Sequence, residues 1–139
     1  MYERCARLHR RSYARRGVAA TELAICMPVI VLIVIATIEA CAMIFLQQSL
    51  SVAAYEGARV SLTPGVEAKN VVYQCELILD DRGVQGSTVE VTPSNIPNAK
   101  EGSWITVQTS TPFAQNSLVG GWLFGNRTLS AEVQMMKER

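Results

Sequence analysis

The most pronounced pattern in the chain is a long apolar run near its start. Residues 23–38 contain no charged side chain, and after Glu39 apolar residues continue from Ala40 to Leu46. About 20 consecutive apolar residues are enough to cross the hydrocarbon core of a bilayer. The run therefore predicts a transmembrane helix over residues 23–46, which Pro28 bends.

Helical periodicity continues beyond this span. One face is polar, and the opposite, apolar face contains Met43, Leu46, Leu50, Ala53, Gly57 and Val60. The sequence Thr63-Pro64-Gly65 then ends the helix. The pattern predicts one long helix over residues 18–62, whose outer half packs on its own domain or on neighbouring subunits.

Residues 63–139 have the pattern of a small α+β domain. A second helix is predicted over about 66–81, started by Thr63 and Pro64 and stopped by Gly83. Its expected buried stripe consists of Ala68, Val72, Cys75 and Leu79. Alternation with period two then predicts strands over residues 88–92, 104–109 and 127–137. We expect about three strands, in one antiparallel sheet packed against helix.

Charge separates the first 17 residues from the rest. This leader contains six Arg against one Glu, whereas the remainder contains seven Lys and Arg against eleven Asp and Glu. Lys and Arg beside a membrane span are retained in the cytoplasm. The chain is therefore expected to be single-pass, with a cytoplasmic leader (1–17), a long helix (18–62) and an exported domain (63–139). A nucleic-acid-binding arm is disfavoured, because the exported part is acidic and has no second basic patch.

Candidate chemistry in the exported part is sparse. The only histidine is His9 in the leader, which excludes His-based acid–base catalysis and His-rich metal sites from the domain. Cys26 and Cys41 are separated by roughly 22 Å along a helix, so they cannot form a disulfide within one chain. Cys75 is interpreted as a small buried apolar residue. We predict no enzymatic activity, no cofactor and no metal.

The junction before the apolar run, Arg15-Arg16-Gly17-Val18-Ala19-Ala20-Thr21-Glu22, has the order typical of prepilin-type signals. Cleavage after Gly17 on the cytoplasmic side leaves the apolar helix on the mature chain, and glycine offers a protease no side-chain hindrance. Glu22 needs a partner at the edge of the span, and the α-amine of Val18 in a neighbouring subunit would supply one. The alternative is a Glu22 solvated by lipid head groups.

Glu39 is a second carboxyl within the apolar region. It either pairs with another subunit, remains protonated, or marks the outer interface of the membrane. A conventional signal peptide cut at Ala40-Cys41-Ala42, or a lipoprotein signal ending at Cys41, is a further alternative. Both are disfavoured by the acidic Glu39 before the cut, and the first also by the length of the apolar run.

Several segments together resemble the TadE-like family, the minor pseudopilins of the tight-adherence (Flp) pilus. They are Arg15 to Ala24, Pro28, Glu39, Gln47-Gln48-Ser49-Leu50 and Ala53-Ala54-Tyr55-Glu56-Gly57-Ala58-Arg59. The resemblance marks Glu56, Gly57 and Arg59 as family-motif residues and implies a pilin-like fold.

The resemblance also implies partners and a location. Its expected partners are a prepilin peptidase, other pilin or pseudopilin subunits and the pilus assembly platform, and its expected location is the bacterial inner membrane, with a role in cell adhesion. The competing hypothesis is a membrane-anchored periplasmic binding module that recruits a partner protein.

Overall fold

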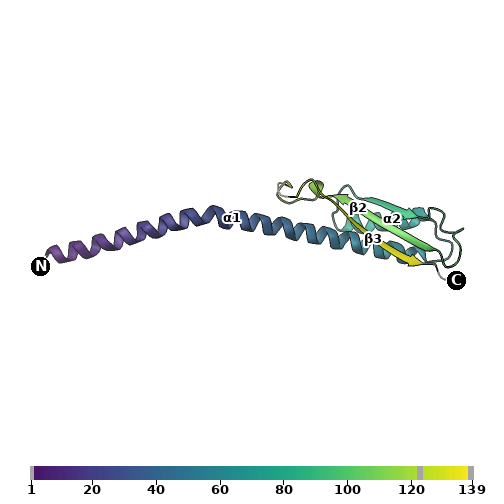
Figure 1. Cartoon of the computed structure of the whole chain (residues 1–139), viewed down its shortest axis with the longest axis horizontal. Coiled ribbons are helices and arrows are strands. Elements are labelled where there is room, and N and C mark those ends of the chain that lie inside the picture. Colours follow the sequence, from purple (N-terminus) through teal and green to yellow (C-terminus); the bar gives the residue numbers. More distant parts are fainter. Residues whose placement is uncertain (1, 122–123, 138–139) are drawn as a thin grey trace. The chain divides into compact units, whose positions relative to one another are not determined.

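The computed structural model describes the backbone of residues 2–121 and 124–137, and the side chains of residues 17–121 and 124–137. Its elements are α1 (Tyr2–Ser61), α2 (Ala68–Asp81), β1 (Thr88–Thr92), β2 (Trp104–Pro112), the 3-10 helix η1 (Phe113–Gln115) and β3 (Thr128–Met136) (Figure 1). The chain divides into two compact units, residues 1–37 and 38–139. The second unit contains the C-terminal part of α1 together with all later elements.

The three strands form an antiparallel sheet in the order β1-β2-β3. Thr109 at the centre of β2 lies opposite Val89 of β1 and Ala131 of β3, so residues with odd numbers share one face of the sheet. The predicted α+β class, with a second helix and a three-stranded antiparallel sheet, is confirmed.

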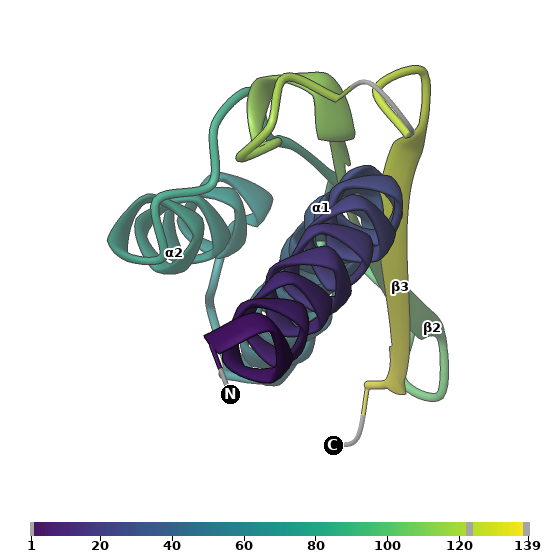
Figure 2. The ribbon, with the colours of Figure 1, turned by 90° about the vertical axis from the view of Figure 1, so that its left-hand side faces the viewer.

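Both helices of the second unit cover this odd-numbered face, while the even-numbered face is more open to solvent and is polar apart from Trp104, Pro112 and Met136. In Figure 2 α2 lies on one side of the second unit and the labelled strands β2 and β3 lie on the other. One core cluster contains Leu46, Leu50, Ala53, Leu79, Val84 and Phe113. The second contains Ala58, Val71, Cys75, Ile96, Ile105 and Val107. The C-terminal half of α1 therefore contributes to both clusters.

Helix α1 follows the predicted apolar face closely, with Leu46, Leu50 and Ala53 fully or nearly fully buried. It ends at Ser61, two positions before the predicted stop at Thr63-Pro64-Gly65. At its other end the backbone of residues 2–16 continues the same helix. The Arg cluster, Cys5 and His9 lie outside the residues whose side chains are described.

The buried stripe of α2 differs from the prediction at one position. Val71, not Val72, is buried together with Cys75 and Leu79, because positions 71, 75 and 79 follow one another at intervals of four on the face toward α1. Ala68 and Val72 are only half-buried. Helix α2 begins later than predicted, at Ala68, and Gly83 follows it with φ +70, as expected for a helix stop.

Strand β2 is longer than the sequence predicted, ending at Pro112 and not at residue 109. The alternation of buried and exposed positions continues through Thr109 and Thr111, which are both buried on the inner face. Hydroxyl side chains occupy these inward positions, so polarity hid the last part of the strand.

Candidate processing and assembly site

The junction that the sequence marked for processing is an exposed stretch of α1. Gly17, Val18 and Glu22 are all exposed, and the Thr21 hydroxyl donates a hydrogen bond to the Val18 carbonyl oxygen at 2.7 Å. This bond is local to the helix and makes no connection to another element. The peptide bond after Gly17 is therefore free of tertiary contacts among the described side chains.

Nothing in the fold requires a glycine at position 17. A Cβ built there has no neighbouring atom within 4 Å, and the backbone is helical. Glycine costs a helix interior about 1 kcal/mol relative to alanine, so its presence calls for another explanation. Steric access for a protease is one that fits this position.

Glu22 is exposed at the start of the apolar run. Among residues 17–121 and 124–137, the ion pairs are Glu56–Arg59 and Glu67–Lys69, and Glu22 takes part in neither. Its carboxylate is therefore available for a charge outside the described side chains of this chain.

The helix that follows is exposed and apolar. Large side chains from Val18 to Ile38 face outward, with Ile25 being 75% exposed. By length and composition, one described helical stretch, Gly17–Ser61, is a candidate membrane span, with a mean hydropathy of 2.8 in its most apolar window. So many exposed apolar side chains are expected where lipid is the solvent. This helix suggests a single-pass membrane anchor.

Glu39 lies within the second unit and is completely buried there. Its Oε1 accepts a hydrogen bond from the Ser117 hydroxyl at 3.2 Å. Ser117 belongs to the connection between η1 and β3, so a residue 78 positions away in sequence covers this carboxyl. The sequence carried no signal for this contact, because a lone serine in a loop has no pattern that singles it out.

The family-motif glycine, Gly57, lies where α2 packs against α1. A Cβ at this position would lie 2.2 Å from Cys75 Sγ and 3.4 Å from Val107 Cγ1 and Val71 Cγ1. The Cys75 thiol in turn donates to the Ala53 carbonyl oxygen at 3.3 Å. Gly57 therefore has a packing role: its missing side chain makes room for the sulfur of Cys75.

Cys75 is fully buried, as the sequence predicted. Burial, with a smaller contribution from the nearby Glu76 carboxylate, raises the pKa of the Cys75 thiol to about 11. The thiol is therefore protonated at neutral pH and is a poor nucleophile.

The two charged motif residues lie on the opposite side of α1. Arg59 and Glu56 form an exposed pair at 3.7 Å. An exposed pair of this kind contributes less than about 1 kcal/mol to stability. The motif thus combines one packing residue with two surface residues.

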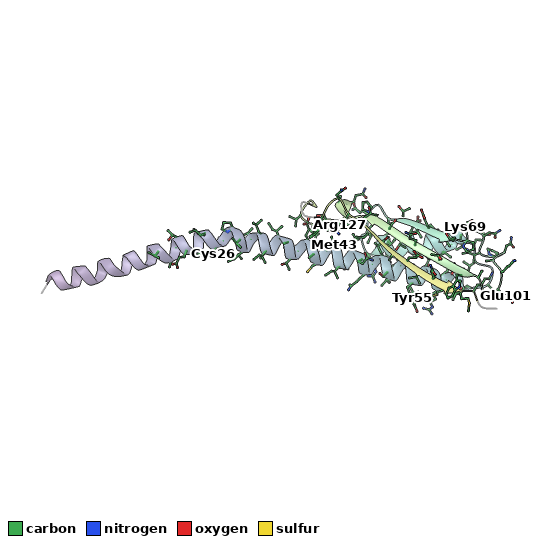
Figure 3. The ribbon with its side chains drawn as sticks, in the orientation of Figure 1. Cys26, Met43, Tyr55, Lys69, Glu101 and Arg127 are labelled. Atoms are coloured by element: carbon green, nitrogen blue, oxygen red, sulfur yellow. The ribbon has the colours of Figure 1, made fainter. Side chains whose placement is uncertain are left out.

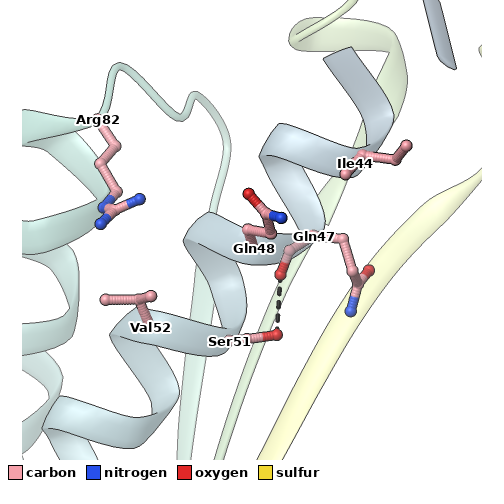
Figure 4. Close-up of a pocket in the computed structure, with 6 residues that line it drawn as sticks. All are labelled: Ile44, Gln47, Gln48, Ser51, Val52 and Arg82. Atoms are coloured by element: carbon pink, nitrogen blue, oxygen red, sulfur yellow. Dashed lines mark hydrogen bonds between the residues drawn. The ribbon is translucent and has the colours of Figure 1, made fainter. Parts of the chain in front are cut away.

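An open groove of about 520 Å³ follows the exposed side of α1. Its lining comprises Ile44, Gln47, Gln48, Ser51 and Val52 of α1, with Arg82 from the end of α2 (Figure 4). The Ser51 hydroxyl donates to the Gln47 carbonyl oxygen at 2.9 Å. No group of three or more His, Cys, Asp or Glu residues in the described part of the chain is placed to hold a metal ion.

Comparison with known proteins supports a family assignment for the N-terminal part. A model of the family described as TadE-like protein matches residues 17–59. No curated protein and no solved structure matches the chain. The matched stretch runs from Gly17 through Glu39 to Arg59, so the predicted TadE-like resemblance is confirmed there. This family implies a function associated with the tight-adherence pilus.

Proposed function

We propose that this chain, whose residues 17–59 are TadE-like, is a minor pseudopilin-like subunit acting in assembly of a tight-adherence pilus. A prepilin peptidase cuts after Gly17, and the mature chain begins at Val18. One span holds the protein in the bacterial inner membrane, with its N-terminus in the cytoplasm and its domain outside. There it contacts other pilin or pseudopilin subunits and the assembly platform.

The observation that carries this proposal is that one helix has two roles: its first part exposes apolar side chains and its second part belongs to the core of the domain. The first part of α1 exposes apolar side chains directly after Gly17 and Glu22, whereas Leu46, Leu50 and Ala53 further along are core residues of the α+β unit. A subunit that leaves the bilayer for a filament needs this arrangement, because the anchoring side chains must find protein partners after assembly.

Glu22 provides a specific contact for that step. Cleavage after Gly17 creates an α-amine on Val18, one helical turn from Glu22. Within an assembly, the Val18 amine of one subunit and Glu22 of the next would neutralise each other away from water. The exposed groove along Ile44, Gln48 and Val52 is a second surface on α1 for a neighbouring helix.

The contacts of the domain count against a conventional signal peptide. Ala42 and Met43 pack against the core cluster of Leu46 and Leu50, and Glu39 accepts a hydrogen bond from Ser117. A cut after Ala42 would remove Glu39 and Ala42 from the folded unit. The binding-module hypothesis with such a cut is therefore the weaker one.

The N-terminal mass of the membrane-extracted protein tests the proposal. We expect a mature chain starting at Val18, and only the full-length precursor when Gly17 is replaced by Ala or a larger residue. Ala24→Leu, a change on the same exposed helix, is the matched control and is expected to be processed normally. A mature chain that begins at Met43, or a wild-type chain that keeps residues 1–17, would contradict the proposal.

A further inference from the structure

The connection between β2 and β3 has an unusual composition for a loop. From Phe113 to Asn126 the sequence contains no charged residue. The connection between β1 and β2, at the opposite end of the sheet, contains the exposed Lys100 and Glu101. The two ends of the same sheet therefore differ in polarity, although loops at a water-exposed surface are ordinarily polar.

The turn within this connection is arranged with its polar side inward. Ser117 Oγ donates to Glu39 Oε1 and accepts hydrogen bonds from the backbone N–H groups of Val119, at 3.3 Å, and of Gly121. The next side chain, Leu118, is 73% exposed, and Val119 is 38% exposed. A turn that hides its hydroxyl and presents its leucine is built for an apolar environment.

The hydrogen bond between Ser117 and Glu39 fixes the position of this turn along α1. Large apolar side chains remain exposed on α1 beyond Glu39, with Phe45 being 53% exposed, before the polar Gln47 and Gln48 begin. Glu39 and Phe45 are six positions apart on the helix, roughly 9 Å at ~1.5 Å per residue. The hydrogen bond of Ser117 to Glu39 therefore lies on the N-terminal side of Phe45, which is the side toward the membrane span.

The cation of this connection lies farther along α1 than the Ser117–Glu39 contact. Figure 3 shows Arg127 level with Met43 along α1, one turn beyond Glu39. Arg127 is exposed and lies 6.0 Å from the Phe124 ring. The charge of this connection is thus displaced from the apolar turn toward the end of α1 where the polar Gln47 and Gln48 begin, which is the direction of the head groups and water in a bilayer.

We propose that residues 117–121 form a second membrane contact, seated in the interfacial layer of the leaflet from which α1 emerges. Leu118 and Val119 face the lipid, and Ser117 covers Glu39, so that the carboxyl is shielded from hydrocarbon. The contact holds the α+β unit against the membrane before assembly. This inference depends on the membrane anchor and is independent of the pilus role.

The position of Leu118 relative to lipid tests this proposal directly. A full-length chain in which Cys5, Cys26 and Cys41 are replaced by alanine receives Leu118→Cys, labelled with an environment-sensitive fluorophore. The labelled chain is placed in phosphatidylcholine–phosphatidylglycerol nanodiscs that hold one copy each and contain spin-labelled quencher lipids. Asn98→Cys, exposed in the opposite loop, is the matched control. The buried Cys75 remains unlabelled in both.

We expect quenching of the probe at position 118 to be about twofold or more stronger than at position 98. Ser117→Ala, which removes the hydroxyl bonded to Glu39, should lower quenching at 118 toward that of the control. Equal quenching at 118 and 98 would overturn the proposal. So would a probe protected from aqueous iodide but not reached by quencher lipids, since protein would then cover Leu118. Val119→Cys gives a second reading if Leu118→Cys disturbs the fold.

Discussion

At the scale of single residues, two glycines on the same helix have opposite meanings. A side chain at Gly17 would meet nothing, whereas one at Gly57 would collide with the sulfur of Cys75. The sequence marked both positions, but only the packing tells them apart. The space beside Gly17 is open, whereas the space beside Gly57 is filled by Cys75 of the same domain.

Gly57→Ala is therefore expected to lower the free energy of unfolding of the domain by about 1–3 kcal/mol through overpacking. Removing the sulfur in Gly57→Ala/Cys75→Ala should relieve the clash. The loss of unfolding free energy in the double variant should therefore be smaller than the sum of the two single-variant losses by at least about 1 kcal/mol. Chemical denaturation of the full chain in detergent measures both values. Gly17→Ala is the control and should not destabilise the domain. If the stability losses of Gly57→Ala and Cys75→Ala simply add up in the double variant, the packing role of Gly57 is contradicted.

The raised pKa of Cys75 predicts a loss of stability in alkali. The thiol ionises near its ordinary pKa of 9.0 in the unfolded chain but only at about 11 in the folded domain. The unfolded state therefore loses its proton first, and the free energy of unfolding falls as pH rises from 9 to 11. The difference between wild type and Cys75→Ala isolates this contribution from other titrating groups. A difference that does not change with pH would show that the thiol is not shielded.

At the scale of elements, a buried hydroxyl connects α1 to the sheet. Thr109 Oγ1, at the centre of β2, donates to the Leu50 carbonyl oxygen at 3.1 Å. Gln47 on the same helix donates through Nε2 to the Ser130 carbonyl oxygen of β3 at 2.9 Å. These polar contacts supplement the apolar packing and specify how the helix lies on the strands.

Thr109→Val keeps the shape of the side chain but removes its hydrogen bond. We expect it to lower the free energy of unfolding by about 0.5–1.5 kcal/mol, the net contribution of a typical hydrogen bond. Thr106→Val on the outer face of the same strand is the control and should be nearly neutral. Equal effects of the two substitutions in urea titrations would argue against the helix–strand bond.

At the scale of the whole molecule, one helix serves as both anchor candidate and domain core. The first unit presents apolar side chains outward, and the second unit uses residues 46–61 of the same helix in its interior. The proposed function depends on this shared helix. When subunits assemble through the helix, Glu22 at its start can contact the α-amine of Val18 in a neighbouring subunit.

Glu22→Ala is expected to leave cleavage after Gly17 intact but to reduce the number of pili several-fold, since the α-amine of Val18 loses its proposed partner. Counts of pili on cells and the mass of the mature chain measure the two effects separately. Glu76→Ala, an exposed carboxylate on α2, is the matched control. Normal pilus numbers with Glu22→Ala would refute the pairing while leaving the processing proposal intact.

The sequence by itself predicted the elements of this protein and the apolar helix that suggests a membrane anchor. Apolar periodicity predicted the long helix, the second helix and the three strands, because backbone geometry repeats at short range and needs no knowledge of distant residues. The same reading ended the second strand before the inward Thr111 and chose Val72 in place of Val71, since polarity and spacing alone do not show which neighbour a side chain meets.

Only the tertiary structure decided what the singled-out residues contact. Glu39 meets Ser117 from a distant loop, and Gly57 meets Cys75 of another helix. Such contacts depend on how the chain folds back on itself, which local pattern does not encode. The folded domain also leaves Leu118 exposed next to Ser117, which bonds to Glu39, and from that placement comes the proposed second contact with the membrane.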